Sequence, residues 1–187
     1  MNKTRCSWVN LNNPLYVKYH DEEWGEPCHD DQKLFERFVL EMFQAGLSWE
    51  CVLNKREAFL KSFDNFDIIK VSKYDEEKIN ILMNTTGIIR NKKKIISTIN
   101  NAKVFRSIIK EYKTFDNYIW SFTDGKIIYE SNLTKSKLSD IICEDLKKRG
   151  MIFIGSKIIY SFLQSIGVIN AHEMGCYKKN VKKMKKI

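Results

Sequence analysis

The sequence predicts an all-α protein, on three observations. Several segments repeat apolar residues at spacings of three and four, and only two prolines interrupt the 187 residues. A 43% hydrophobic fraction with 11 phenylalanines is enough for a packed core. This length fits one domain or two closely packed lobes. We expect a single domain over residues 1–187, made of two packed helical lobes and ending in a disordered basic tail at residues 177–187.

Two helices are expected in the first half of the chain. The first begins at a cap formed by Asp30 or Asp31 and ends at Gly46. Its apolar stripe consists of Leu34, Phe35, Phe38, Val39, Met42 and Ala45. A shorter helix is expected over residues 75–83, ended by the Asn-Thr-Thr-Gly turn that closes at Gly87.

The second half is also mainly helical by pattern. A long helix is expected over residues 92–112, with Ile95, Ile99, Ala102 and Ile109 facing inward. Two more helices are expected over residues 139–149 and 158–166, stopped by Gly150 and Gly167. The aromatic segment 115–122 fits either a helix or a strand. The Asp124–Gly125 pair predicts a tight turn, with a short β-hairpin running into residues 126–129.

The charge balance favours a polyanionic partner. The formal net charge is +9 and the isoelectric point about 9.2, as is common for nucleic-acid-binding proteins. An AT-biased genome also produces lysine-rich proteins, and many of these lysines would then simply solvate the surface. This explains the charge equally well. The N-terminus lacks the apolar run of a secretory signal, and no segment has the roughly 20 apolar residues that cross a bilayer. We therefore expect a cytoplasmic protein with no membrane partner, whose five cysteines are free or metal-bound.

Cysteine and histidine residues near the two ends of the chain suggest a metal site. His172 and Cys176 form an H-x3-C pair, which one helical turn or a tight loop can aim at a single ion. Cys6 and His20 are 14 residues apart, a spacing that a loop returning to a helix can bridge. Two thiolates and two imidazoles form the closed tetrahedral set of a structural zinc. By spacing alone, a buried thiol with histidines that satisfy core hydrogen bonds is favoured over this site, and Cys28–His29 is a competing pair.

Glu41 is the candidate catalytic residue. On a helical wheel it lies beside the apolar stripe, and a carboxylate buried there is often functional. The pattern by itself favours a plainer interpretation, an exposed ion pair with Arg37 four residues earlier. The neighbouring aromatic residues can stack on nucleobases or belong to the core; they are Trp8, Tyr16, Tyr19, Trp24 and Trp49.

The segment from Gly87 to Lys92 is a candidate phosphate site. A glycine-centred hairpin between two helices would present backbone N–H groups and lysines to a phosphate. A plain helix–helix turn fits the same residues. The lysine-rich tail can contact DNA phosphates or form a solvated end.

Seven blocks of sequence together resemble the 3-methyladenine DNA glycosylase I family. In order they are R-C-S-W-V (5–9), P-L-Y-V-K-Y-H-D-E-E-W-G (14–25), L-E-M-F-Q-A-G-L-S-W (40–49), G-I-I-R-N (87–91), L-K-K-R-G-M-I-F-I-G (146–155), Y-S-F-L-Q (160–164) and H-E-M-G-C (172–176). The resemblance runs from about residue 5 to residue 176. It implies an all-α fold related to the helix-hairpin-helix glycosylases.

The resemblance also implies roles for particular residues. It assigns a structural zinc that joins the N- and C-terminal segments to Cys6, His20, His172 and Cys176. It places Glu41 in the pocket for the methylated base, together with Tyr16, Tyr19, Trp49 and Trp8. It assigns DNA contacts to Gly46, Leu47, Gly87, Ile88, Arg90, Asn91 and Lys92.

The expected activity is hydrolysis of the N-glycosidic bond of 3-methyladenine in double-stranded alkylated DNA, by a monomeric, monofunctional enzyme that flips the base. One alternative is a non-catalytic, zinc-stabilised nucleic-acid-binding protein. Another is a zinc hydrolase of small molecules, which would need an open metal position.

Overall fold

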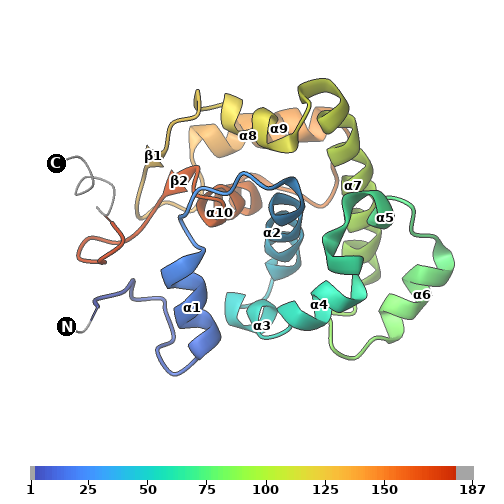
Figure 1. The fold of residues 1–187 in the computed structure, drawn as a ribbon, viewed down its shortest axis with the longest axis horizontal. Helices are drawn as coiled ribbons and strands as arrows, with labels where there is room; N and C mark the ends of the chain where they lie inside the picture. Colours follow the sequence, from blue (N-terminus) through green and yellow to red (C-terminus); the bar gives the residue numbers. More distant parts are fainter. Residues whose placement is uncertain (1–2, 180–187) are drawn as a thin grey trace.

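The computed structural model describes residues 3–179 and is mostly helical (Figure 1). The elements are α1 (Pro14–Glu22), α2 (Asp31–Gln44), α3 (Trp49–Leu53), α4 (Arg56–Ser62), the 3-10 helix η1 (Asp64–Phe66), α5 (Ile68–Val71), α6 (Glu76–Asn84), α7 (Lys92–Tyr112), α8 (Phe115–Ser121), β1 (Ile128–Tyr129), α9 (Lys137–Lys148), α10 (Ser156–Ser165) and β2 (Ile169–Asn170). This confirms the predicted helical class.

The periodic segments form helices where they were predicted, and their caps explain where they begin. Asp30 caps α2 by accepting a hydrogen bond from the N–H of Lys33, and Asn91 caps α7 in the same way. Residues 115–121 form helix α8. The start predicted for α9 at Ser139 was wrong, because Ser136 caps this helix and Ser139 instead completes a capping box with it.

The hairpin predicted after Asp124–Gly125 was also wrong. Strand β1 pairs in parallel with β2, with Ile128 opposite Ile169. A parallel partner must come from a distant part of the chain, and here α9 and α10 lie between the two strands. Just before β2, Gly167 lets the chain pass close to another segment, because a Cβ there would lie 2.4 Å from the backbone of Glu26.

Helix α2 lies at the centre of the molecule, with α3–α7 on one side and α8–α10 on the other (Figure 1). It packs against α3, α7, α8 and α10. One continuous apolar core runs from Cys28 to Ile169, and a smaller cluster joins Cys6, Tyr19 and Cys176. The division into two lobes stays a prediction, since the large core includes residues on both sides of α2.

The segments that lead to the two ends of the chain lie together. The N–H of Tyr177 donates to the carbonyl of Thr4, and Lys178 forms a 2.6 Å ion pair with Glu26. Residues 177–179 form a half-buried turn, and the disorder expected for the basic tail stays a prediction. Residues 180–187, the rest of that tail, lie outside the described residues.

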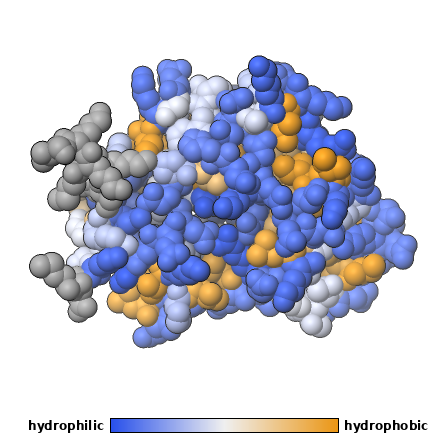
Figure 2. All heavy atoms as spheres, viewed as in Figure 1, coloured by the Kyte–Doolittle hydropathy of each residue, from blue (hydrophilic) through white to orange (hydrophobic). Residues whose placement is uncertain are grey.

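The face seen in Figure 2 is mostly hydrophilic, and its apolar residues gather in separate patches. Within residues 3–179, no helix is both long and apolar enough to cross a membrane.

Candidate active site

Glu41 lies at the floor of a cavity of about 210 Å³. Its side chain is buried, with 5% of the residue exposed, because α2 passes through the centre of the fold. The cavity is lined by Trp8, Tyr16, Tyr19, Trp24, Glu41, Gln44, Trp49, Ser161 and Gln164. Pockets for drug-sized ligands usually measure about 300–1,000 Å³, so this one suits a smaller ligand of about the size of a single base.

The carboxyl group of Glu41 is unpaired among the described residues. Arg37 does not form the ion pair with it that the spacing suggested. Instead, the Arg37 guanidinium donates to the carbonyl of Ser165 at 2.6 Å and lies 3.8 Å from Glu23. Burial raises the pKa of Glu41 to about 8, and the positive charge of Arg37 opposes this only in part. This pKa favours the neutral carboxylic acid at neutral pH.

Aromatic rings form the walls of the cavity. The ring centroids of Tyr19 and Trp49 are 4.9 Å apart, and those of Trp8 and Tyr16 are 5.5 Å apart. Burial raises the pKa of both tyrosines, so their hydroxyls are neutral donors. The indole N–H of Trp49 is buried without a hydrogen-bond partner in the described part of the chain. The structure thus brings together all five residues expected at the base pocket.

Four lining residues were not among those expected. Gln44 follows Glu41 by three residues, so the two lie on the same face of α2, and this spacing was a usable signal. Ser161 and Gln164 are related in the same way on α10. Trp24 had been noted as an aromatic neighbour, and its ring lies 4.7 Å from that of Trp8.

Gly46 and Leu47 are exposed just beyond the end of α2. Gly46 has a φ of +81°, a conformation that glycine adopts without strain, and it lies in the turn between α2 and α3. The buried amine of Lys94, near the start of α7, donates to the carbonyls of Phe43 and Ala45, both at 2.7 Å. Lysine at a helix C-terminus satisfies carbonyls that have no partner within the helix. This amine ties the end of α2 to α7.

The segment between α6 and α7 forms the expected connection. A Cβ on Gly87 would lie 2.8 Å from the Cβ of Ala58, so glycine is required there for space. Arg90 and Lys92 are exposed, as a phosphate site requires. The Ile88 side chain is buried in the core, so only its backbone is available to a partner.

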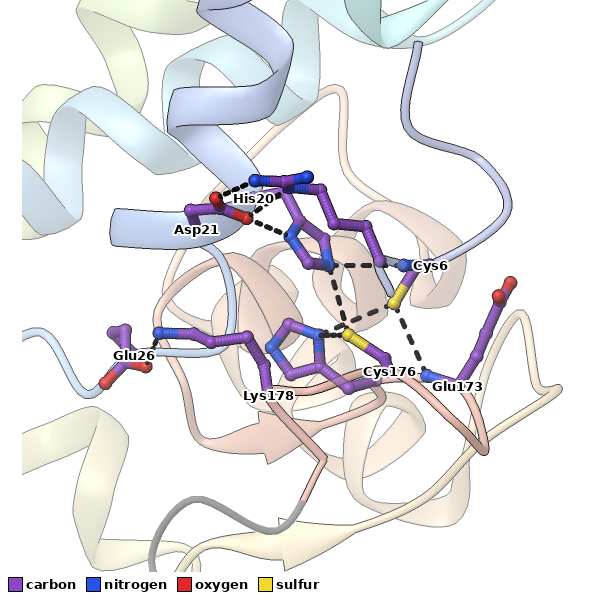
Figure 3. Close-up of polar contacts among 9 residues, drawn as sticks. Cys6, His20, Asp21, Glu26, Glu173, Cys176 and Lys178 are labelled. Atoms are coloured by element: carbon purple, nitrogen blue, oxygen red, sulfur yellow. Dashed lines mark hydrogen bonds and ion pairs between the residues drawn. The ribbon is translucent and has the colours of Figure 1, made fainter. Parts of the chain in front are cut away.

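Cys6, His20, His172 and Cys176 converge at a second centre (Figure 3). All four are buried, and their donor atoms lie within 4.8 Å of one another. The sulfur–nitrogen distances are 3.5 Å for Cys6–His172, 3.4 Å for Cys176–His20 and 3.6 Å for Cys176–His172. A tetrahedral zinc with bonds of about 2.3 Å to sulfur and 2.0–2.1 Å to nitrogen gives sulfur–nitrogen edges of roughly 3.5 Å. The cluster therefore fits such an ion.

The surroundings of this cluster orient its imidazoles. Asp21 lies 2.9 Å from Nδ1 of His20 and leaves Nε2 facing the cluster, while Arg5 holds the same carboxylate with two hydrogen bonds (Figure 3). A Cβ on Gly25 would lie 2.8 Å from Nε2 of His172, so only glycine fits there. The competing Cys28–His29 pair is not part of the cluster, because His29 is exposed and bonds Asp116 instead.

The protein is mostly helical and has an unpaired buried carboxyl group in an aromatic pocket, and a Cys₂His₂ cluster joins its ends. These features are those expected of the class of base-recognising enzymes that the sequence blocks resemble. The family model described as methyladenine glycosylase matches residues 8–179. The chain belongs to this family.

Comparison with individual proteins supports the family membership. The chain is 42% identical over 178 residues to DNA-3-methyladenine glycosylase 1 of Escherichia coli, covering 92% of this chain and 95% of that protein. It is 41% identical over 179 residues to the DNA-3-methyladenine glycosylase of Haemophilus influenzae, covering 92% and 96%. A crystal structure of 3-methyladenine DNA glycosylase I superposes with a TM-score of 0.89 at 41% identity, covering 94% of this chain and 99% of that one. A variant of such an enzyme, solved in complex with 3-methyladenine, gives a TM-score of 0.89 at 31% identity, covering 94% and 97%.

The raised pKa of Glu41 makes the stability of the protein depend on pH. The stabilisation associated with the protonated group is fully present below its unfolded value of 4.5 and is lost as pH rises through about 8. We therefore expect the free energy of unfolding of the wild type to fall relative to that of Glu41→Gln between pH 5 and pH 9, by up to about 1.4 kcal/mol per pH unit. Urea titrations at several pH values measure this. The exposed control Glu57→Gln should follow the wild type, and a parallel pH dependence of Glu41→Gln would contradict the raised pKa.

Proposed function

We propose that this protein is a DNA repair glycosylase that hydrolyses the N-glycosidic bond of 3-methyladenine in double-stranded alkylated DNA. The observation that carries the proposal is the buried, unpaired carboxyl group of Glu41 in a pocket walled by aromatic rings. Family membership and the relatives named above support the same activity.

The chemistry of the substrate explains why a buried carboxyl group is useful. Methylation at N3 gives the purine a positive charge, so the base leaves as a neutral molecule and needs little acid assistance. A cation beside Glu41 would lower the pKa of this carboxyl from about 8 and favour its ionised form. Normal adenine is neutral and would supply no such compensation. Glu41 thus accepts a hydrogen bond from the base edge and favours the charged base over the normal one, and water attacks the sugar carbon.

The aromatic walls compensate for the energy of extracting the base. Flipping costs a few kcal/mol, and less at a damaged base. Stacking against an aromatic ring such as Trp49 returns roughly 1–3 kcal/mol, with a further cation–π contribution for a charged purine. Tyr16 and Tyr19 supply shape and hydroxyl groups, and Trp8 closes the side nearest the N-terminal segment.

The DNA would lie across the end of α2 and the α6–α7 connection, which we propose is a helix-hairpin-helix element. Gly46 and Leu47 would face the gap left by the flipped base. Gly87, Ile88 and Asn91 would offer their backbone to a phosphate, while Arg90 and Lys92 supply positive charge. We expect the enzyme to act as a monomer.

We further propose that the Cys₂His₂ cluster holds one structural zinc. Four protein ligands leave no open position for an activated water, so the metal would join the chain ends without entering the reaction. It would also support the pocket, because the His172 ring lies 4.6 Å from the Trp24 ring and the His20 ring lies 5.3 Å from the Trp8 ring.

Substitution of Glu41 tests the activity. We expect Glu41→Gln to keep its fold and metal content but to release 3-methyladenine at least 10²-fold more slowly, the usual effect of removing one electrostatic contact to the reacting group. The released base is measured by chromatography after incubation with methylated duplex DNA. Glu57→Gln, on the exposed face of α4, is the control. A wild-type protein that binds the DNA without releasing base would instead support the non-catalytic nucleic-acid-binding alternative.

Salt dependence tests the proposed DNA face. Each phosphate contact releases counterions, so the DNA association constant falls as salt is added. Removing one phosphate contact should make the plot of log association constant against log salt concentration less steep by about 0.9. We expect this change for Lys92→Gln in binding titrations from 50 to 200 mM salt. Lys61→Gln, exposed on α4, should leave the slope unchanged. Equal slopes for all three proteins would exclude Lys92 from the interface.

Metal analysis tests the cluster. We expect one zinc per wild-type chain, and loss of zinc with a lower melting temperature in Cys176→Ala. Cys28→Ala is the matched control, because Cys28 is also a buried cysteine but lies outside the cluster. Retention of zinc by Cys176→Ala, or its loss from Cys28→Ala, would refute the assignment.

A further inference from the structure

Phe153 has an uncommon backbone conformation for its residue type. It lies in the loop between α9 and α10, has a φ of +57° and is 38% exposed. Left-handed conformations are unfavourable for bulky side chains and are usually adopted by glycine or asparagine. Phe66 also has a positive φ, but its ring is fully buried in the core. Packing thus explains the conformation of Phe66, whereas the ring of Phe153 remains open to solvent.

The loop around Phe153 is fixed from α7. Asn101 is fully buried and forms two 3.0 Å hydrogen bonds with the backbone of Ile152, as donor to its carbonyl and acceptor from its N–H. Asn100 donates to the carbonyl of Gly150 at 2.8 Å. Strained conformations persist where the surroundings over-determine them, and such residues gather at functional sites.

The same helix places Phe153 beside the end of α2. The amine of Lys94 lies 5.8 Å from the centroid of the Phe153 ring and 2.7 Å from the carbonyl of Ala45. Gly46 and Leu47 follow directly, and Leu47 is itself 41% exposed. Lys94 thus connects the loop of the exposed Phe153 ring to the end of α2, two residues before the exposed Leu47.

The charge around the loop matches a polyanion. Lys147 and Lys148 precede the loop and Lys157 follows it; all three are exposed, and none forms an ion pair within residues 3–179. Lys93, at the start of α7, is exposed as well. An exposed apolar ring in a loop flanked by exposed lysines suits duplex DNA, in which an apolar side chain can enter between base steps while cations hold the phosphates.

We propose that Phe153 inserts into the base stack beside the extruded nucleotide and acts as a wedge that helps to keep the duplex open. It would do so in addition to Gly46 and Leu47, which would face the gap left by the flipped base. This inference rests on the proposed glycosylase function and adds a contact outside the base pocket. It makes Phe153 a positioning residue: the ring acts on the DNA duplex and does not touch the reacting bond.

Duplexes that carry a stable abasic-site analogue, with 2-aminopurine beside it, test the inference without requiring base release. For the wild type we expect 2-aminopurine fluorescence to rise on binding, because its stacking is broken. Phe153→Ala should show little rise and an affinity weakened roughly 5- to 150-fold, the size of one base–aromatic stacking contact. Phe153→Trp should restore both. Ile69→Ala, which removes a 56% exposed apolar side chain from α5, is the matched control.

Two further measurements separate the possible failures. Binding of free 3-methyladenine, followed by tryptophan fluorescence, should be unchanged in Phe153→Ala, whereas a disturbed pocket would weaken it. Full affinity and a full 2-aminopurine response in Phe153→Ala would overturn the wedge even if the protein is an active glycosylase. A wild type that releases no methylated base would overturn the proposed function whatever the Phe153 variants show.

Discussion

The burial of helix α2 is the constraint on which the site depends. Neighbouring helices cover α2 so completely that nine of its residues are buried, and two of these nine are glutamates. Glu36 has a partner in Arg56 at 2.7 Å, whereas Glu41 faces the cavity and has none among the described residues. Two carboxylates on one helix thus have opposite chemistry. One forms a salt bridge with Arg56, and burial without such a partner raises the pKa of the other.

Helix α7 connects the buried helix α2 to the loops at the surface. Its first turns contact the end of α2 through Lys94 and the α9–α10 loop through Asn100 and Asn101. The α6–α7 connection, the end of α2 and the loop of Phe153 are therefore mounted on one rigid element. A duplex would meet a surface that is already arranged, so little ordering entropy would be lost on binding.

The sequence predicted those parts of the fold that depend on local pattern. Helices α2, α6, α7 and α10 have apolar stripes and clear stop signals, so periodicity located them. Helix α1 has no such stripe, because its inner face carries Tyr16, Tyr19 and His20 toward the pocket and the cluster. The β1–β2 pair was not predictable from the turn at Gly125, since its partner strand follows two further helices.

Prediction of the site was also limited to features that depend on nearby residues in the sequence. The spacing of Arg37 and Glu41 favoured an ion pair. This pair does not form, because other segments bring the carbonyl of Ser165 and the carboxylate of Glu23 to Arg37. Spacing likewise left Cys28–His29 open as metal ligands, and only the family resemblance chose among the candidates before three-dimensional contacts were known. Phe153 lay within a recognised block, but residue type alone does not reveal a positive φ.

The cluster that joins the chain ends also sets an order of events during synthesis. Cys6 and Cys176 are 170 positions apart, so the first two residues of the cluster leave the ribosome long before the last two exist. A chain that ends between residues 44 and 172 contains α2 and Glu41 but has neither His172 nor Cys176. Trp24, which lines the cavity, then lacks the His172 ring that lies 4.6 Å from it. Completion of the packing around this cavity is thereby linked to synthesis of the segment that carries His172.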